Sequence, residues 1–304
     1  MATKKPKTST KTTTKSKTTK PKTAAKTAEK TVIEAPKTNT VEKNEKKNFL
    51  SGFFAKKYEG TESIMTIFKE RKFYGALLGE VIGTMLLALL IFSISMMNIA
   101  NIAAYAFAIV AIFVAVVMFS GASLNPLVTV GLMATRRVSV IRGIMYIIAE
   151  IVGAWLGWMI FNAFHLAGGE TAYDVPAMAA VAEGNFWIVT MVEFLGSTIF
   201  AFFVARALDY KRSVFTFAAV IAGGLILAII IGYVVSAAFV GLSSNFAYNP
   251  ALALMFQIFP TAGENFGEIL GGICQALAIY AIFPCIGGVL GFYLSDFMKK
   301  LSED

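Results

Sequence analysis

The sequence predicts an all-α membrane protein in which six transmembrane helices and two half-length helices form two inverted repeats. Three observations predict this fold: the chain is unusually apolar, its apolar runs are long enough to cross a bilayer, and the same motifs occur twice. Of 304 residues, 57% are hydrophobic and 15% are charged, whereas about 25% of the residues of a soluble domain are charged. A mean hydropathy of +0.67 agrees with a folded part whose solvent is lipid.

Six apolar runs have the length of about 20 residues that a helix needs to cross the hydrocarbon core. We expect spans at about 74–97, 101–119, 141–165, 186–208, 214–239 and 275–297. Two further apolar stretches, about 125–135 and 249–259, are too short to span. They predict half-length helices.

Each short stretch opens with an Asn-Pro motif, Asn125-Pro126-Leu127 in the first and Asn249-Pro250-Ala251 in the second. Asn is a favoured N-cap and Pro a favoured first helical residue, so each motif predicts a helix start. One Asn-Pro is usually an ordinary cap. Two at matching points of an apolar array indicate helices that begin inside the membrane, where irregular backbone is tolerated only if protein buries it or a wet cavity adjoins it.

The two halves of the chain repeat each other. Glu80-x-x-Gly83-Thr84 in the first span corresponds to Glu193-x-x-Gly196-Ser197 in the fourth. Three spans per half invert the repeats, about 73–165 and 186–298, so the two half-helices should enter from opposite sides and meet near the midplane. Two helix N-termini at that point repel cations, and the Asn NH2 groups can donate to a water or hydroxyl oxygen in the lumen.

Charge is distributed very unevenly along the chain. Only 8 of the 27 Lys and Arg residues follow Phe73, which leaves 19 before it. The basicity therefore belongs to a tail, and no nucleic-acid partner is expected. The 8 later residues all fall on the side of the predicted bundle that carries the N-terminus: Arg136, Arg137, Arg142, Arg206, Lys211, Arg212, Lys299 and Lys300. The positive-inside rule makes that side cytoplasmic, with both termini on it, in a multi-pass protein of the plasma membrane.

Four segments follow from this pattern. Residues 1–48 are a Lys- and Thr-rich cytoplasmic tail with too few large apolar residues to fold. It is either a solvated extension or an electrostatic clamp on anionic lipid. Residues 49–72 mix aromatic and basic residues as amphipathic helices at a membrane surface do. Residues 73–298 form the membrane domain, and 299–304 a short cytoplasmic C-terminus.

The stretch from Phe119 to Gly131, FSGASLNPLVTVG, resembles the first pore motif of the aquaporin and glycerol-facilitator (major intrinsic protein) family, and Asn249-Pro250-Ala251 resembles the second. The resemblance covers about residues 73–297. It implies six tilted helices, two half-helices and one pore per subunit, usually in a homotetramer. It also implies passive conduction of water, glycerol or similar neutral molecules, with no cofactor, no metal and no catalytic residues.

The chain departs from the family pattern near both motifs. Leu127 stands where the family usually has Ala, Leu252 where it nearly always has Arg, and Ser123 where it often has His. By the resemblance, the outer constriction, or selectivity filter, falls on four residues: Tyr105, Ala237, Phe246 and Leu252. This ring has one phenolic hydroxyl and no charge, and it suits an uncharged, apolar-tolerant solute.

Three carboxylates lie within predicted spans. An ionisable residue in a span is by default a functional candidate, so a proton relay is one reading of Glu80 and Glu193. The resemblance favours a structural role for both, in which each accepts backbone N–H bonds from the loop before a half-helix. Glu150 in the third span has no evident partner in the sequence.

Two other functions remain open besides a passive channel. A proton-coupled small-solute transporter could use one of the three carboxylates, and a non-conducting scaffold could have its lumen plugged by Leu127 and Leu252. Cys274 and Cys285 are interpreted as small apolar residues, and the single histidine, His165, as a solvated side chain rather than a metal ligand.

Overall fold

The computed structural model describes residues 64–95, 102–121, 123–169, 186–209, 213–240, 246–258 and 265–303. All of them belong to one compact unit, Glu45–Asp304. Within these ranges the regular structure is helical throughout. The predicted tail 1–48 and the predicted interfacial segment up to residue 63 lie outside the described residues.

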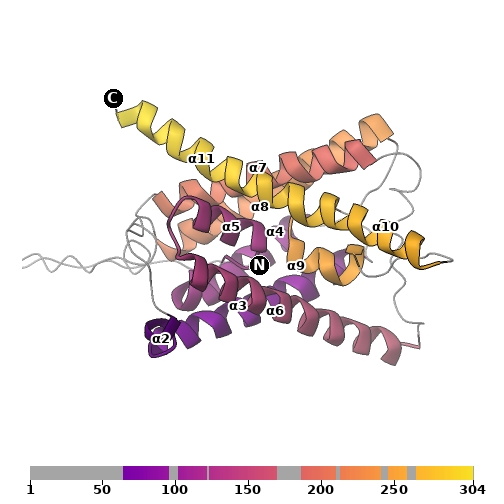
Figure 1. Cartoon of the computed structure of the whole chain (residues 1–304), viewed down its shortest axis with the longest axis horizontal. Coiled ribbons are helices and arrows are strands. Elements are labelled where there is room, and N and C mark those ends of the chain that lie inside the picture. The colour runs from indigo at the N-terminus through magenta and orange to yellow at the C-terminus, as the bar shows by residue number, and fades with distance from the viewer. Residues whose placement is uncertain are drawn as a thin grey trace, which may run out of the picture. The chain divides into compact units, whose positions relative to one another are not determined.

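The described elements are mostly long helices, and the short ones are a single turn at the start and two half-length helices (Figure 1). Their bounds are α2 Ile64–Ile67, α3 Arg71–Ser95, α4 Ile102–Ser120, α5 Pro126–Ala134, α6 Val140–Ala167, α7 Phe186–Asp209, α8 Val214–Val240, α9 Pro250–Ala253 with the π-helical η3 Leu254–Ile258, α10 Phe266–Leu277, the π-helical η4 Ala278–Ile282, and α11 Phe283–Glu303. Among the described residues, five helical segments are long and apolar enough to cross a membrane, and the shorter apolar helix Ala104–Ser120 within α4 is the next candidate. The two short helices α5 and α9–η3 begin at the two Asn-Pro motifs.

The last span is longer than the sequence predicts. We expected residues 260–274 to belong to an outer loop, but α10 begins at Phe266 and runs through η4 into α11. Asn265 caps this start, because its side chain accepts from the Glu268 N–H at 3.1 Å and donates to the Glu268 carboxylate at 2.9 Å. This reciprocal Asn–Glu cap is a helix-start signal, and Gly267, Gly271 and Gly272 lie inside the helix that it starts. α11 also extends through Glu303, so the expected separate C-terminus from 299 is helical.

The first span begins earlier than predicted, at Arg71, so the predicted interfacial segment 49–72 ends sooner. Its described part is the single turn α2, in which Ile67 is fully buried while Met65 is 70% exposed. The side chain of Ile67 belongs to the main buried apolar cluster of the molecule. This turn is therefore two-sided, with one residue anchored in the core.

The two halves pack in the same way. α3 lies along α6 in the first half and α7 lies along α11 in the second, while α4 and α8 meet between the halves. Figure 1 shows α3 and α6 on one side of the bundle and α7 and α11 on the other, and the view from behind shows the same pairs. The half-helices α5 and α9 approach the centre from opposite ends (Figure 1).

Small residues allow these close helix pairs. A Cβ added at Gly153 of α6 would collide with the carbonyl oxygen of Val81, and one added at Gly287 of α11 would lie 2.5 Å from that of Phe194. Val81 and Phe194 each follow a repeated glutamate by one residue. The contact is therefore the same in both halves, which fixes the correspondence of α6 to α11.

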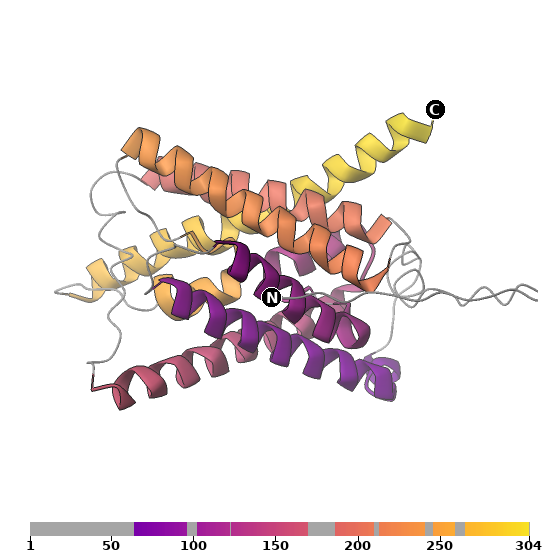
Figure 2. The ribbon, with the colours of Figure 1, turned by 180° about the vertical axis from the view of Figure 1, so that it is seen from behind.

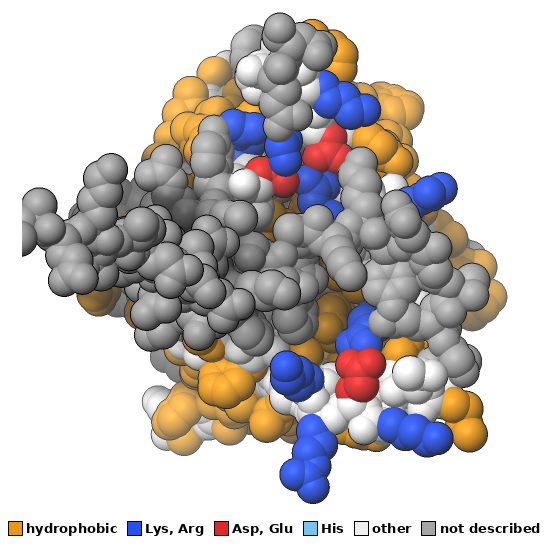
Figure 3. Space-filling view, turned by 90° about the vertical axis from the view of Figure 1, so that its left-hand side faces the viewer, with side chains coloured by type: hydrophobic (Ala, Val, Ile, Leu, Met, Phe, Trp, Pro, Cys, Tyr) orange, Lys and Arg blue, Asp and Glu red, His pale blue; other side chains and the backbone are white. Residues whose placement is uncertain are grey.

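Charged side chains gather at the end of the bundle that carries α2 and the C-terminus, which we call the basic end (Figure 3). Arg137, which follows α5, is 7% exposed and lies 2.7 Å from Asp296 of α11 and 3.2 Å from Asp209 of α7. Its guanidinium also lies over the Phe292 ring, 5.4 Å from the centroid. This one side chain ties the first half-helix to two long helices of the second half.

Candidate functional site

The loop before the first half-helix is held by Glu80. The two carboxylate oxygens of this fully buried side chain accept backbone N–H bonds from Ser123 at 3.2 Å and Leu124 at 2.7 Å. Leu124 has a φ of 51°, a left-handed conformation that costs a branched residue about 1–2 kcal/mol. The carboxylate stabilises this turn, which aims the following Asn into the centre of the molecule.

Glu193 holds the second loop in the same way. Its carboxylate accepts from the N–H of Ala247 at 2.7 Å and of Tyr248 at 3.1 Å. Tyr248 has a φ of 39°. Tyr248 thus corresponds to Leu124, and each of the repeated glutamates has both oxygens occupied by the loop of its own half.

Each Asn caps its own half-helix. Asn125 accepts the Leu127 N–H at 3.1 Å, and Asn249 accepts the Ala251 N–H at 3.0 Å. These bonds satisfy donors at a helix start that lack a partner within the helix. Pro126 and Pro250 occupy the first helical position in each case.

The side-chain amides also cross between the halves. Asn125 donates to the carbonyl oxygen of Tyr248 at 2.7 Å, and Asn249 donates to that of Leu124 at 2.9 Å. We expected the NH2 groups to serve the lumen. One N–H of each is instead used to tie the two half-helices together, which leaves the second N–H of each amide as the group that can meet a solute.

Both Asn side chains line one cavity. The remaining lining residues are Leu87, Ile91, Phe113, Ser123, Phe200, Leu225, Ile229, Phe246, Ala247 and Leu252. None of these described residues is charged, and eight of the ten are large apolar side chains. The polar side chains of the wall are therefore those of the Asn pair and Ser123.

Two of the four predicted filter residues, Phe246 and Leu252, line this cavity, and Tyr105 and Ala237 do not. Leu225 and Ile229 are the lining residues of α8, and Gly232 continues their face. A Cβ at Gly232 would lie 3.2 Å from the Phe246 ring. Ala237 is five residues further on, about 140° around the helix, and its side chain is exposed. Gly232 is therefore the α8 residue that lies against the Phe246 ring, and the assignment of Ala237 to the filter stays a prediction.

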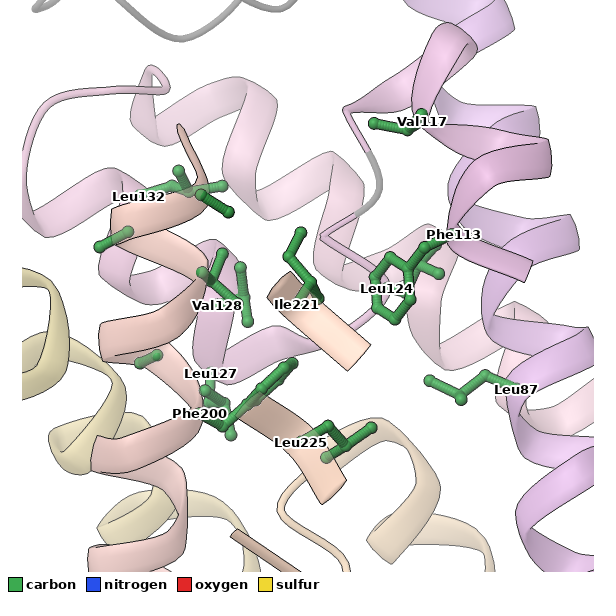
Figure 4. Close-up of a cluster of buried hydrophobic side chains, with 14 of the residues drawn as sticks. Leu87, Phe113, Val117, Leu124, Leu127, Val128, Leu132, Phe200, Ile221 and Leu225 are labelled. Atoms are coloured by element: carbon green, nitrogen blue, oxygen red, sulfur yellow. The ribbon is translucent and has the colours of Figure 1, made fainter. Parts of the chain in front are cut away.

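Leu127 lies outside the cavity wall. It is fully buried in an apolar cluster with Phe200 and Leu225, two residues that do line the cavity (Figure 4). A Cβ at Gly288 of α11 would collide with the Leu127 carbonyl oxygen. Leu127 therefore supports the wall from behind. Of the two residues that would plug the lumen of a scaffold, Leu252 lines the cavity and Leu127 does not.

The partners of Glu150 could not be found by sequence reasoning. One of its oxygens, Oε1, accepts the hydroxyl of Ser123 at 2.8 Å and that of Thr129 at 2.7 Å. The other, Oε2, is buried with no hydrogen-bond partner within the described structure. The carboxyl group thus reaches the cavity wall through Ser123.

The remaining candidates are the histidine and the two cysteines. His165 stacks on Phe161 near the end of α6, with ring centroids 6.0 Å apart. Across the described ranges, His, Cys, Asp and Glu side chains form no group that could hold a metal ion. Cys274 and Cys285 are free thiols.

Known proteins are similar to this chain in sequence. The model of the major intrinsic protein family matches residues 67–294. The probable aquaporin AqpM of Archaeoglobus fulgidus is 27% identical over 65% of this chain and 75% of its own length. The aquaporin AqpM of Methanothermobacter marburgensis is 29% identical over 62% of this chain and 71% of its own.

The fold has a solved counterpart. The X-ray structure of the aquaglyceroporin from Plasmodium falciparum superposes with a TM-score of 0.57, covering 74% of this chain and 96% of the other at 16% identity. This structural similarity shows the fold alone. The family match, in contrast, covers the part of the sequence that contains the two loops, the Asn pair and the cavity residues. The chain belongs to the major intrinsic protein family.

Proposed function

We propose that solutes cross this protein through the cavity at the Asn pair and that an uncharged, mostly apolar wall selects them. As a member of its family the chain is a passive membrane channel for water or small uncharged solutes, and it is not an enzyme. The observation that carries the finer proposal is that Asn125 and Asn249 open into one cavity whose other lining residues carry no charge.

The shape and polarity of the wall favour small neutral solutes. Phe246 and Leu252 form the constriction beside the Asn pair, and Leu252 offers no hydrogen bond where a cationic side chain would offer several. A polyol must shed many water molecules that this wall cannot replace, at a cost for each unpaired group. Water and compact solutes with few polar groups give up fewer hydrogen bonds to water, so they pass faster than glycerol.

The half-helices support the exclusion of cations. Both N-termini point at the Asn pair, and each carries about half a positive charge. A cation at this point would meet two such partial charges and an apolar wall that cannot replace its hydration shell. The proposed permeability series is therefore water first, then compact neutral solutes, then glycerol, with cations excluded.

Stopped-flow light scattering on proteoliposomes tests the proposal. Water, urea and glycerol permeabilities are measured in one preparation, beside empty liposomes and the Leu252→Arg variant. We expect wild-type water and urea permeability above that of empty liposomes. We also expect Leu252→Arg to raise the permeability of glycerol relative to that of urea, because a guanidinium supplies donors for hydroxyl groups. Permeability equal to that of empty liposomes, with the protein folded, would instead support the scaffold.

A pH gradient separates a channel from a coupled transporter. A passive pore lets solute reach equal concentrations on both sides whatever the gradient. Accumulation of solute against its own gradient, driven by protons, would contradict the channel. Glu150→Gln is the informative variant in that case, since Glu150 is the carboxyl group with an unpaired oxygen.

The setting of the channel is also a proposal. The basic end faces the cytoplasm of a plasma membrane, so that both termini lie inside. The chain assembles as a homotetramer, as the family usually does, and the Lys-rich tail 1–48 contacts anionic lipid. Cross-linking in native membranes tests the tetramer, and protease access to a tag at either terminus tests the orientation.

A further inference from the structure

Glu150 and the two residues whose hydroxyl groups donate to it, Ser123 and Thr129, form a polar cluster that we call the Glu150 group. This group is present in only one of the two otherwise matching halves. Glu80 and Glu193 make equivalent loop contacts, as do Gly153 and Gly287 with the helices beside them. A fixed offset relates each pair of elements: 124 residues for the loops, from Asn125 to Asn249, and 134 for α6 and α11, from Gly153 to Gly287.

These offsets give the second-half counterparts of the Glu150 group. Ser123 corresponds to Ala247, Thr129 to Ala253, and Glu150 to Pro284. All three polar residues are thus replaced by apolar ones, while Ala247 still lines the cavity and still donates its N–H to Glu193 at 2.7 Å. The second half-helix forms without such a group, so the architecture does not require it.

Hydrogen-bond accounting indicates what the group does at the cavity. A hydroxyl has one proton, and Ser123 gives its proton to Glu150 Oε1, which takes a second from Thr129. Ser123 can then offer only lone pairs to a molecule in the cavity. Asn125 and Asn249, whose Oδ1 atoms cap the half-helices, offer only N–H groups.

We propose that Ser123, oriented by Glu150, is the side-chain hydrogen-bond acceptor of the cavity wall and forms a donor–acceptor site with the Asn pair. The site takes neutral solutes that carry both an oxygen acceptor and an O–H or N–H donor, such as water, simple alcohols, urea and small amides. A solute of similar size that can only accept binds the Asn amides but leaves Ser123 unpaired. Ser123 is the specificity-determining residue and Glu150 a positioning residue. The inference rests on the proposed conduction through this cavity.

Urea and dimethyl sulfoxide separate these two classes, because both are small neutral molecules with one strong oxygen acceptor but only urea donates. Their difference in size is the same for every variant, so the change of the permeability ratio between variants is the readout. Their permeabilities and that of water are compared in proteoliposomes that contain wild type or a variant. Ser123→Ala should lower water and urea permeability about 2- to 10-fold relative to that of dimethyl sulfoxide, the equivalent of one net hydrogen bond. Ser123→Thr keeps the hydroxyl and should keep the wild-type ratio.

Variants at the matched and supporting positions test the asymmetry. Ala247→Ser perturbs the same cavity wall in the other half and should not lower the ratio of urea to dimethyl sulfoxide permeability. Glu150→Gln keeps an acceptor oxygen for Ser123 and Thr129 and should retain the ratio. Glu150→Met keeps the volume but frees the Ser123 proton, so it should lower the ratio as Ser123→Ala does. A purely structural role of Glu150 would not move this ratio.

The outcomes distinguish the inference from the function on which it rests. Wild-type permeability equal to that of empty liposomes for all three molecules would overturn the proposed channel. A conducting wild type whose permeability ratio is unchanged in Ser123→Ala and in Glu150→Met would overturn only the donor–acceptor site. If Ser123→Ala does not fold, Ser123→Cys replaces it, because sulfur is a weak acceptor and the side chain is similar in size.

Discussion

The side-chain amide of Asn125 donates to the carbonyl oxygen of Tyr248 at 2.7 Å, across the boundary between the two halves of the chain. The carbonyl belongs to the residue directly before Asn249, and Asn249 makes the reciprocal bond to Leu124 at 2.9 Å. Each Asn therefore holds its own helix by its oxygen and the opposite loop by its nitrogen. The positions of the two half-helices are coupled through a pair of bonds at the wall of the cavity.

Loss of one Asn should therefore damage both stability and conduction. Asn125→Ala removes a cap and leaves the Tyr248 carbonyl and the Leu127 N–H without these bonds. We expect a loss of about 2–4 kcal/mol in the free energy of unfolding, from a cap of about 1 kcal/mol and one or two unsatisfied groups. Water permeability per folded protein should fall as well.

The control is Asn162→Ala in α6. Its amide donates to the Trp158 carbonyl of its own helix at 3.3 Å, a local bond that crosses no boundary. We expect a loss below about 1 kcal/mol and unchanged permeability. Thermal unfolding in detergent compares the two variants, and equal destabilisation would show that the crossing bond has no special weight.

The close helix pairs predict that two glycine-to-alanine variants change the stability of the protein in different ways. Gly153→Ala would drive a methyl group into the Val81 carbonyl oxygen, and the backbone on both sides can move little. Overpacking of this kind costs about 1–3 kcal/mol. Gly223→Ala in α8 is the matched control, because a Cβ there meets nothing within 4 Å and Ala favours the helix by up to about 1 kcal/mol. Thermal unfolding should therefore move in opposite directions for the two variants, and a shared direction would contradict the packing argument.

The ion pairs of the basic end predict that loss of a largely buried carboxylate destabilises the protein more than loss of an exposed one. Asp296→Asn leaves the Arg137 guanidinium with a weaker partner in a site where Arg137 is 7% and Asp296 is 18% exposed. We expect a loss of about 2 kcal/mol, as for a charged hydrogen bond. Glu70→Gln is the control, since Glu70 pairs with Arg142 at 2.9 Å but is 45% exposed. An exposed pair contributes about 0–1 kcal/mol, so Glu70→Gln should have a smaller effect that added salt reduces further.

The parts of the fold that depend on local sequence could be predicted. Helix caps and apolar run lengths are local signals, so the Asn-Pro starts and the spans follow from the residues around them. The repeat of Glu80 as Glu193 placed two carboxylates in matching helices. Asn265 and Glu268 give a local start signal for α10 as well, but the prediction did not use it and began the last span at residue 275.

The parts that depend on tertiary approach could not be predicted. Glu150 meets Ser123 and Thr129 only because α6 packs against the first half-helix, and nothing in the spacing of these residues specifies it. The contact of Gly232 in α8 with Phe246 also depends on how α8 packs against the second loop. The crossing bonds of the Asn pair likewise depend on how two inverted halves meet.

The proposed constriction at Phe246 and Leu252 gives the last prediction. Phe246 lines the cavity beside Leu252 and stacks on Tyr248 with ring centroids 5.6 Å apart. Phe246→Ala removes the ring from the wall and widens the path next to the Asn pair, so permeability to solutes larger than water, such as glycerol, should rise more than that of water.

Phe107→Ala in α4 is the control, because Phe107 is 70% exposed and is absent from the cavity lining. Loss of Phe246 also weakens the support of Tyr248, whose carbonyl accepts from Asn125, so thermal unfolding is measured on the same preparation. A folded Phe246→Ala variant with the wild-type ratio of glycerol to water permeability would show that the constriction lies elsewhere along the path.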